Sequence, residues 1–313
     1  MSDATDRPAT QDRRAFLTTL GGAALAAGGM GVFGCARGPN GSATGGESAI
    51  ATGAGASAGS MVAPIGLQLY TLRDEMKRDM AATLARVART GYTQVEFAGY
   101  FDRTPEQVRA MLDANGLTAP SAHVPLQMLQ ANPAAVIAAA KTIGHAYIIN
   151  PWVEEKSRGT LAEWRNLARS MNDFGAQLAA SGLKLGYHNH DFEFALVEGT
   201  VPYEVLVGET DPRYVAMEMD LYWAAKAGQD PLAWFAKHPG RFQLVHVKDS
   251  RGAPNNEMVP VGSGTIDWKR IFAHRTEAGI KHYIIEHDNA ADYAGGPFAS
   301  IESSYNYLSK LRV

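Results

Sequence analysis

The architecture of this chain can be worked out from one short stretch, GHAYIIN at residues 144–150. An alanine-rich, amphipathic segment precedes the glycine, a short apolar run follows it, and a polar residue ends the run. Glycine suits the position after a helix, where φ is positive. The apolar run suits a parallel strand that is buried on both faces. The stretch therefore predicts a helix, a turn and a buried strand, in that order.

The same unit recurs along the chain. Four other segments begin with a glycine and end on a polar residue, and three further apolar runs end in the same way. The eight strands expected from them are 65–70, 91–96, 116–123, 144–150, 182–188, 214–220, 242–246 and 279–286. Helices are expected at 74–90, from 104, from 132, and at 160–180, 202–208, 231–237, 266–278 and 300–311. Eight strands that alternate with helices predict an α/β protein, a (β/α)8 TIM barrel.

Composition narrows the class of protein. The 313 residues are 46% hydrophobic and 19% charged, which fits a folded domain with a large core. The net charge of −3 gives no basic footprint for nucleic acid. A single cysteine excludes an intramolecular disulfide and a thiolate-rich metal site. No G-x-G-x-x-G follows the first strand, which disfavours a dinucleotide-binding fold.

The first sixty residues are not expected to belong to the barrel. Arg13 and Arg14 precede a short, glycine-rich apolar run and resemble a twin-arginine export signal. The run ends at Cys35 in a sequence that resembles a bacterial lipobox, so we expect Cys35 to be lipidated, the alternative being an incidental cysteine. Residues 36–60 are mostly Gly, Ala, Ser, Thr and Asn and predict a flexible linker. The expected parts are a signal at 1–35, a linker at 36–60 and the barrel at 61–313. The expected location is the periplasm, either free or anchored to a membrane by the lipid.

Polar residues end every expected strand, and the carboxyl ends of barrel strands meet at one mouth, where active sites of this fold lie. Four of them stand on strands five to eight, namely His188, Asp220, His246 and Glu286. Two imidazoles and two carboxylates suit Mn²⁺, Co²⁺ or Zn²⁺ better than Ca²⁺, which prefers oxygen ligands. The sequence therefore predicts a divalent metal site at the mouth.

These residues carry a family resemblance. Residues 61–313 resemble the xylose isomerase-like barrel superfamily, the sugar phosphate isomerases and epimerases. The matching stretches are QLYT at 68–71, YHNHDFEF at 187–194, EMDLYW at 218–223, HVKD at 246–249 and GSGTIDW at 262–268. The resemblance implies that Asp220, His246 and Glu286 hold the metal, with Mn²⁺ as first choice and Co²⁺, Zn²⁺ or Mg²⁺ as alternatives. His188 stands where well-studied epimerases have a glutamate that acts as an acid/base, so Glu193, His190 or a water at the metal are alternative bases.

The expected reaction begins with removal of a proton next to a carbonyl that the metal polarises. The catalytic residues would be Glu286, His188 and Lys248, the last of which would stabilise the enediolate. Return of the proton gives an isomerase or epimerase. Loss of a β-hydroxyl or a glycosidic leaving group gives a lyase or dehydratase. The first half of the reaction is common to both outcomes.

Other residues at the strand ends are expected to bind the substrate. They are Glu96, His123, His190, Tyr222 and Trp223. Glu96 has the equal alternative of orienting His123 or Lys248, and the two aromatic residues have the alternative of packing in the core. Residues 262–264 could offer backbone amides to an anion, or could simply form a turn.

We expect a metal-dependent sugar isomerase or epimerase first. The runner-up is a lyase or hydratase that acts on 3-keto-glycosides, which the expected export favours. A surface carbohydrate-binding protein without catalysis is a third reading, and an endonuclease at abasic sites is disfavoured by the charge. The expected partners are a small carbohydrate and, through Cys35 only, a membrane; nucleic acid is not expected.

Overall fold

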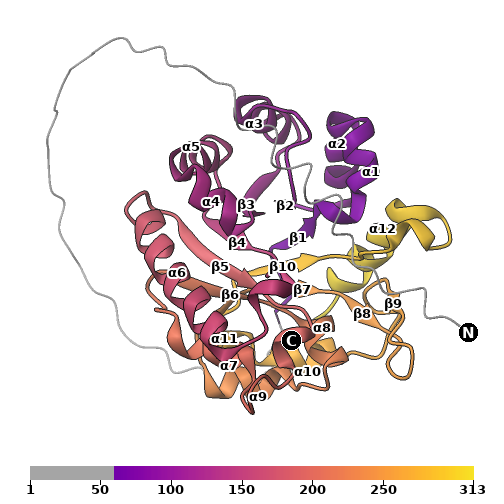
Figure 1. The fold of residues 1–313 in the computed structure, drawn as a ribbon. Helices are drawn as coiled ribbons and strands as arrows, with labels where there is room; N and C mark the ends of the chain where they lie inside the picture. The colour runs from indigo at the N-terminus through magenta and orange to yellow at the C-terminus, as the bar shows by residue number, and fades with distance from the viewer. Residues whose placement is uncertain (1–59) are drawn as a thin grey trace, which may run out of the picture.

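The computed structural model describes residues 60–313, and its eight parallel strands close into a barrel (Figure 1). Neighbouring strands pair in the order β1-β10-β7-β6-β5-β4-β3-β2. The strands are β1 Ile65–Gln68, β2 Gln94–Phe97, β3 Thr118–His123, β4 Tyr147–Asn150, β5 Lys184–His188, β6 Val215–Asp220, β7 Phe242–Val247 and β10 His282–Ile285. The predicted TIM barrel is confirmed. The predicted export signal, Cys35 and nearly all of the predicted linker lie outside the described residues.

Helices surround the barrel in Figure 1 and follow the strands in the predicted alternation. They are α1 Arg73–Arg78, α2 Met80–Thr90, α3 Pro105–Ala114, α4 Leu126–Ala131, α5 Pro133–Ile143, α6 Leu161–Ala179, α7 Pro202–Glu209, α8 Leu221–Lys226, α9 Pro231–Lys237, α10 Trp268–Ala273, α11 Arg275–Ala278 and α12 Gly296–Leu308. No helix within 60–313 has the length and apolar character needed to span a membrane.

Local sequence signals explain where these helices begin and end. Thr104 and Thr160 form capping boxes at the starts of α3 and α6, so the first backbone N–H groups have acceptors. Gly91 and Gly144 follow α2 and α5 in the left-handed conformation, as the glycine pattern predicted.

The structure departs from the expected elements at several places, among them two short helices, α4 and α8, that were not expected. Strand β1 ends at Gln68, and Leu69–Leu72 form a 3-10 turn because the Gln68 side chain accepts a hydrogen bond from the Tyr70 N–H. The expected helix 74–90 divides at Asp79, whose carboxylate caps the start of α2. The expected helix 266–278 divides at His274. A small antiparallel hairpin, β8 Asp249–Ser250 and β9 Met258–Val259, was not expected.

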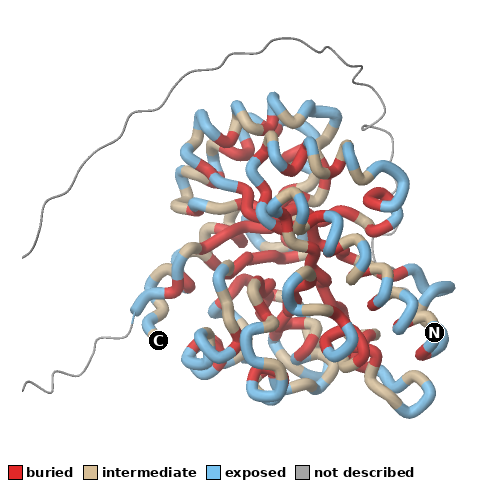
Figure 2. Tube along the Cα trace, turned by 90° about the vertical axis from the view of Figure 1, so that its left-hand side faces the viewer, coloured by how far each residue is buried: buried red, intermediate tan, exposed pale blue. Residues whose placement is uncertain are grey.

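Side chains fill the barrel interior in layers along its axis, and its strands are largely buried (Figure 2), with the less buried residues mainly at their amino ends. A separate apolar cluster fills one part of the interior: Tyr147, Ile149, Ala216, Leu244 and Ile284. Gly186 faces this layer, where a Cβ atom would collide with Ile149. Because side chains alternate along a strand, the residues two positions further on in β5, β6, β7 and β10 face the same interior nearer the mouth. The candidate site is built from those residues.

Candidate metal centre and active site

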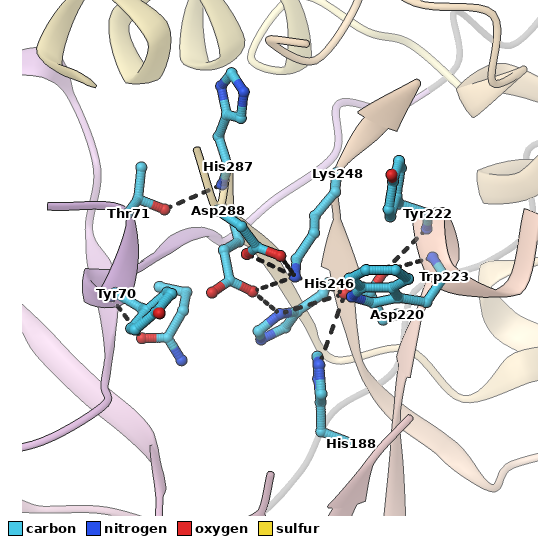
Figure 3. A network of polar contacts seen from close by, with 12 residues as sticks. Tyr70, Thr71, His188, Asp220, Tyr222, Trp223, His246, Lys248, His287 and Asp288 are labelled. Carbon is cyan, nitrogen blue, oxygen red and sulfur yellow. Dashed lines mark hydrogen bonds and ion pairs between the residues drawn. The ribbon is translucent and has the colours of Figure 1, made fainter. Parts of the chain in front are cut away.

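Three of the four predicted metal ligands come together at the mouth. Asp220 ends β6, His246 stands near the end of β7, and Glu286 follows β10. One ligand atom from each of them lies within 4.8 Å of the other two. His246 Nδ1 is 2.8 Å from Glu286 Oε2 and 3.9 Å from Asp220 Oδ2. The fourth predicted ligand, His188, ends β5 and has its Nε2 atom 3.7 Å from Asp220 Oδ2. Figure 3 shows the rings of His188 and His246 directed toward Asp220.

The donor set fits a divalent cation. Both Asp220 and His246 are completely buried, and Glu286 is 5% exposed. Asp220 Oδ1 accepts hydrogen bonds from the N–H groups of Tyr222 and Trp223, each at 3.0 Å, so the carboxylate is held in place. Asp220 Oδ2 accepts no well-aligned hydrogen bond, and its close partner is the Lys248 ammonium group at 3.0 Å. A buried carboxylate oxygen beside an imidazole nitrogen and a second carboxylate is a group for which a cation is the natural partner.

Lys248 points into the mouth, as predicted from its position two residues after His246 (Figure 3). Its ammonium group lies 3.0 Å from Asp220 Oδ2, 2.7 Å from Glu286 Oε2 and 3.0 Å from Asp288 Oδ1. Burial lowers the pKa of Lys248, but the three carboxylates outweigh burial and hold that pKa well above its usual value. Burial likewise raises the pKa of Glu286, but Lys248 and His246 outweigh it and hold the pKa below its usual range. The pair is therefore an ammonium in contact with a carboxylate.

A second layer of charged groups lies directly beneath the mouth and holds the far sides of the two histidines. Glu96 Oε1 is 2.8 Å from His246 Nε2, and Glu218 Oε2 is 3.2 Å from His188 Nδ1. His188 thus has Nδ1 on a carboxylate and Nε2 toward the mouth, whereas His246 has a carboxylate at both nitrogens, Glu96 at Nε2 and Glu286 at Nδ1. A carboxylate on the far nitrogen of a histidine is the arrangement that orients metal ligands. Burial lowers the pKa of His246, but the surrounding glutamates outweigh burial and hold it well above its usual value, so metal binding would displace a proton from this ring. Glu218 was not predicted, although its position two residues before Asp220 on β6 was the signal that could have found it.

His123 joins the two carboxylates of this lower layer. Its Nε2 atom lies 2.9 Å from Glu96 Oε1 and 2.8 Å from Glu218 Oε2. Burial lowers the pKa of His123, but the two glutamates outweigh burial and raise it to about 9. Burial lowers the pKa of His188, and the nearby cations, His246 first, lower it further. His188 is therefore a neutral imidazole, the form that binds metals.

Glu96 and His123, predicted as substrate contacts, lie in this lower layer. Glu96 is completely buried and also accepts a hydrogen bond from Gln68 at 2.6 Å. Its contacts match the alternative in which it orients a neighbouring histidine, with His246 as a partner that the sequence did not suggest. His123 is 9% exposed and contacts both glutamates. Their substrate contacts stay predictions.

The other predicted substrate residues form one wall of the mouth. The His190 ring lies 5.0 Å from the His188 ring and 5.4 Å from the Trp223 ring. Trp223 also lies beside Lys248 (Figure 3), and its indole Nε1 is buried without a hydrogen-bond partner. Tyr222 instead donates its hydroxyl to the carbonyl of Asn256 at 2.8 Å, which fastens the β8–β9 loop beside the site.

The sequence suggested Glu193 as an alternative base and residues 262–264 as an anion site, but both groups make other hydrogen bonds in the structure. Glu193 is completely buried and accepts hydrogen bonds from the Tyr187 hydroxyl at 2.7 Å and the His190 N–H at 2.8 Å. Tyr187 precedes His188 and so faces away from the barrel interior, which separates Glu193 from the mouth. The N–H groups of Gly262 and Gly264 donate to Asp249 Oδ2 at 2.8 and 3.2 Å, and the Ser263 N–H donates to the Pro260 carbonyl at 2.9 Å. They are therefore not available to an external anion.

Comparison with known proteins places this geometry in a family. The model of the xylose isomerase-like TIM barrel family matches residues 84–308. The chain belongs to the xylose isomerase-like TIM barrel family. The resemblance inferred from the strand-end motifs is thus confirmed at the level of the family.

Proteins similar to this chain are named for differing activities. Inosose dehydratases of Lacticaseibacillus casei and Geobacillus thermodenitrificans are each 26% identical to this chain, over 171 and 175 residues. Each match covers 50% of this chain, and the chain spans only 57% and 58% of the two relatives' lengths. A sugar phosphate isomerase/epimerase of Parabacteroides distasonis superposes with a TM-score of 0.70 at 27% identity, covering 81% of this chain and 95% of that one.

Proposed function

We propose that this domain is a divalent-metal-dependent lyase of the dehydratase type, which acts on a keto-sugar or a cyclic keto-polyol. The similarity to inosose dehydratases supports elimination over isomerisation, which the sequence motifs alone had placed first. The observation that carries the proposal is the contact of 2.7 Å between Lys248 Nζ and Glu286 Oε2. It joins a proton acceptor and a proton donor at one mouth, which is what an elimination needs.

Asp220, His246 and Glu286 would hold the metal, with His188 beside them. The bound metal would supply Lewis-acid polarisation of the substrate carbonyl, which acidifies the neighbouring C–H bond. Mn²⁺ is our first choice, and Co²⁺, Zn²⁺ and Mg²⁺ are alternatives. Glu96 and Glu218 would fix the ring orientation of His246 and His188 through their far nitrogens.

The chain's own side chains account for the proton movements. Glu286 takes the α-proton, because Lys248 and His246 keep its carboxylate ionised. A carbon–carbon double bond forms as the bond to the β-oxygen breaks, and Lys248 gives a proton to the departing oxygen, which leaves as water or as an alcohol. The proton then passes from Glu286 to Lys248 across their contact. Both groups return to their starting states, and no other reactant is consumed.

An isomerase or epimerase is the second candidate. The superposition on the Parabacteroides distasonis isomerase/epimerase favours it, because that match covers nearly the whole of the other chain. The first proton transfer would be the same, and the proton would return to carbon instead of being followed by loss of the β-oxygen. The two candidates therefore differ in the product and not in the initial step.

Product mass after reaction in D₂O distinguishes them. We expect the manganese-loaded protein to convert one of a panel of inososes, keto-sugars and 3-keto-glycosides into a product that lacks one water or one alcohol. An isomerase would instead give a product of unchanged mass apart from incorporated deuterium. A complete absence of both mass loss and deuterium uptake across the panel would reject both enzymatic proposals and favour a carbohydrate-binding protein.

A further inference from the structure

A groove opens beside the barrel mouth that the proposed reaction does not use. Its volume is about 340 Å³, at the lower end of the roughly 300–1,000 Å³ typical of small-molecule sites. Its walls come from α4, from the segment after β4 and from α6. Because α4 and that segment follow the carboxyl ends of β3 and β4, the groove lies at the same end of the barrel as the candidate metal centre.

The lining combines side-chain amides and apolar surface with two carboxylates, those of Glu154 and Glu163. Gln127, Gln130 and Asn166 provide side-chain amides, which both donate and accept hydrogen bonds. Trp152 and Leu167 provide apolar surface between them. No lysine, arginine or histidine lines the groove itself, although Arg169 donates to Asn166 Oδ1 from beside it. The carboxylates of Glu154 and Glu163 would repel a phosphate or a carboxylate. Apolar surface combined with amide groups suits an uncharged ring that carries hydroxyl groups.

Trp152 connects the groove to the mouth. Its ring stands edge-on to the His190 ring at 4.7 Å, and the His190 ring is 5.0 Å from that of His188. The groove is thus two ring contacts away from the predicted metal ligands. A ligand with one ring at the mouth and a second ring joined to it could extend past Trp152 into the groove.

We propose that this groove binds the second sugar ring of a neutral disaccharide whose first ring is placed at the mouth. The inference rests on the proposed function and narrows its substrate class: a glycoside with a sugar leaving group, in preference to a free monosaccharide or a sugar phosphate. The groove would hold the part of the substrate that departs, while Glu286 and Lys248 act on the ring that stays.

Binding measurements on the manganese-loaded protein test this without any turnover. The probes are cellobiose, maltose and trehalose, with glucose and glucose 6-phosphate for comparison, in isothermal titration calorimetry. We expect at least one disaccharide to bind about 10-fold more tightly than glucose, the effect of one or two net hydrogen bonds. Glucose 6-phosphate should bind no better than glucose.

Gln127 and Asn166 line the groove and are exposed, so they can be replaced to test the assignment. The double variant Gln127→Leu/Asn166→Leu should lose the preference for the disaccharide while keeping the wild-type affinity for glucose and the wild-type Tm. Arg165→Ala is the control, since Arg165 precedes Asn166 on α6 and pairs with Glu209 outside the groove. Trp152→Ala is a further variant that should act in the same direction.

Equal affinities for glucose and all three disaccharides, or a preference that survives in the double variant, would overturn the groove assignment. Failure to detect any sugar would overturn it as well. Absence of deuterium uptake and mass loss in the D₂O experiment would instead reject the proposed function, whatever the binding results. The two failures are therefore distinguishable.

Discussion

Replacing Lys248 by methionine is expected to lower kcat by about 10²–10⁴-fold, the usual contribution of a positioned proton donor. Lys248 is the ammonium group in contact with Asp220, Glu286 and Asp288, and in the proposed reaction it protonates the departing oxygen. Methionine has a similar length but neither charge nor proton. The substitution removes a cation from beside the predicted ligands, so metal content should be retained or increased. Steady-state kinetics with metal analysis on the same preparation checks both expectations.

A nearby lysine gives the control for this prediction. Lys226 lies on α8, pairs with Asp191 at 3.1 Å and sits over the Trp223 ring, outside the carboxylate cluster. Lys226→Met should change kcat by less than about threefold, since partly exposed ion pairs contribute little. If Lys248→Met loaded with metal kept wild-type kcat, the role of Lys248 as proton donor would be wrong.

Replacing Glu218 by glutamine is expected to weaken metal binding by about 10–100-fold, as losses of outer partners of metal ligands do. Glu218 Oε2 lies within 3.3 Å of one nitrogen each of His123, His188 and His246. Burial, and then the neighbouring Glu96, raise the pKa of Glu218 to about 7, so the carboxylate is partly ionised at neutral pH. The amide keeps the size of the side chain but removes this charge and one of the two acceptor oxygens. Competition with a chromophoric chelator measures the change in Kd, and kcat should recover at saturating metal.

Glu193→Gln is the matched control, because Glu193 is equally buried and contacts Tyr187 and the His190 N–H, away from the interior. Burial raises the pKa of Glu193 to about 8, so glutamine replaces a group that is largely neutral at pH 7. We expect its metal Kd to stay within about threefold of wild type. Equal metal affinities for Glu218→Gln and the wild type would show that the lower layer does not support the ligands.

The barrel could be predicted from sequence because its repeat is local. A glycine after each helix and an apolar run after each glycine are visible in single segments such as residues 144–150. The breaks at Asp79 and His274 were missed, because helical periodicity continues across them, whereas capping by the Asp79 side chain is decided by its rotamer. The β8–β9 hairpin was missed because it has only two residues in each strand.

The part of the candidate site that could be predicted consists of the residues at the carboxyl ends of the strands. Asp220, His246, Lys248 and Glu286 meet as expected, since parallel strands bring their carboxyl ends together. The contacts within the lower layer could not be predicted from the spacing of residues along the sequence alone. Whether Glu96 turns toward a substrate or toward His246 depends on the radius of the barrel and on the stagger of β2 against β7, which are properties of the closed sheet.

Metal content tests the central claim, that the mouth of this barrel holds a divalent ion on the side chains that the strands bring together. Wild-type protein, Asp220→Ala and His246→Ala would each be loaded with Mn²⁺, Co²⁺ or Zn²⁺, dialysed, and analysed by plasma mass spectrometry. Circular dichroism would confirm that each variant is folded. The account predicts stoichiometric metal in the wild type and loss of that metal in both variants. Folded variants that keep the full wild-type content would contradict it.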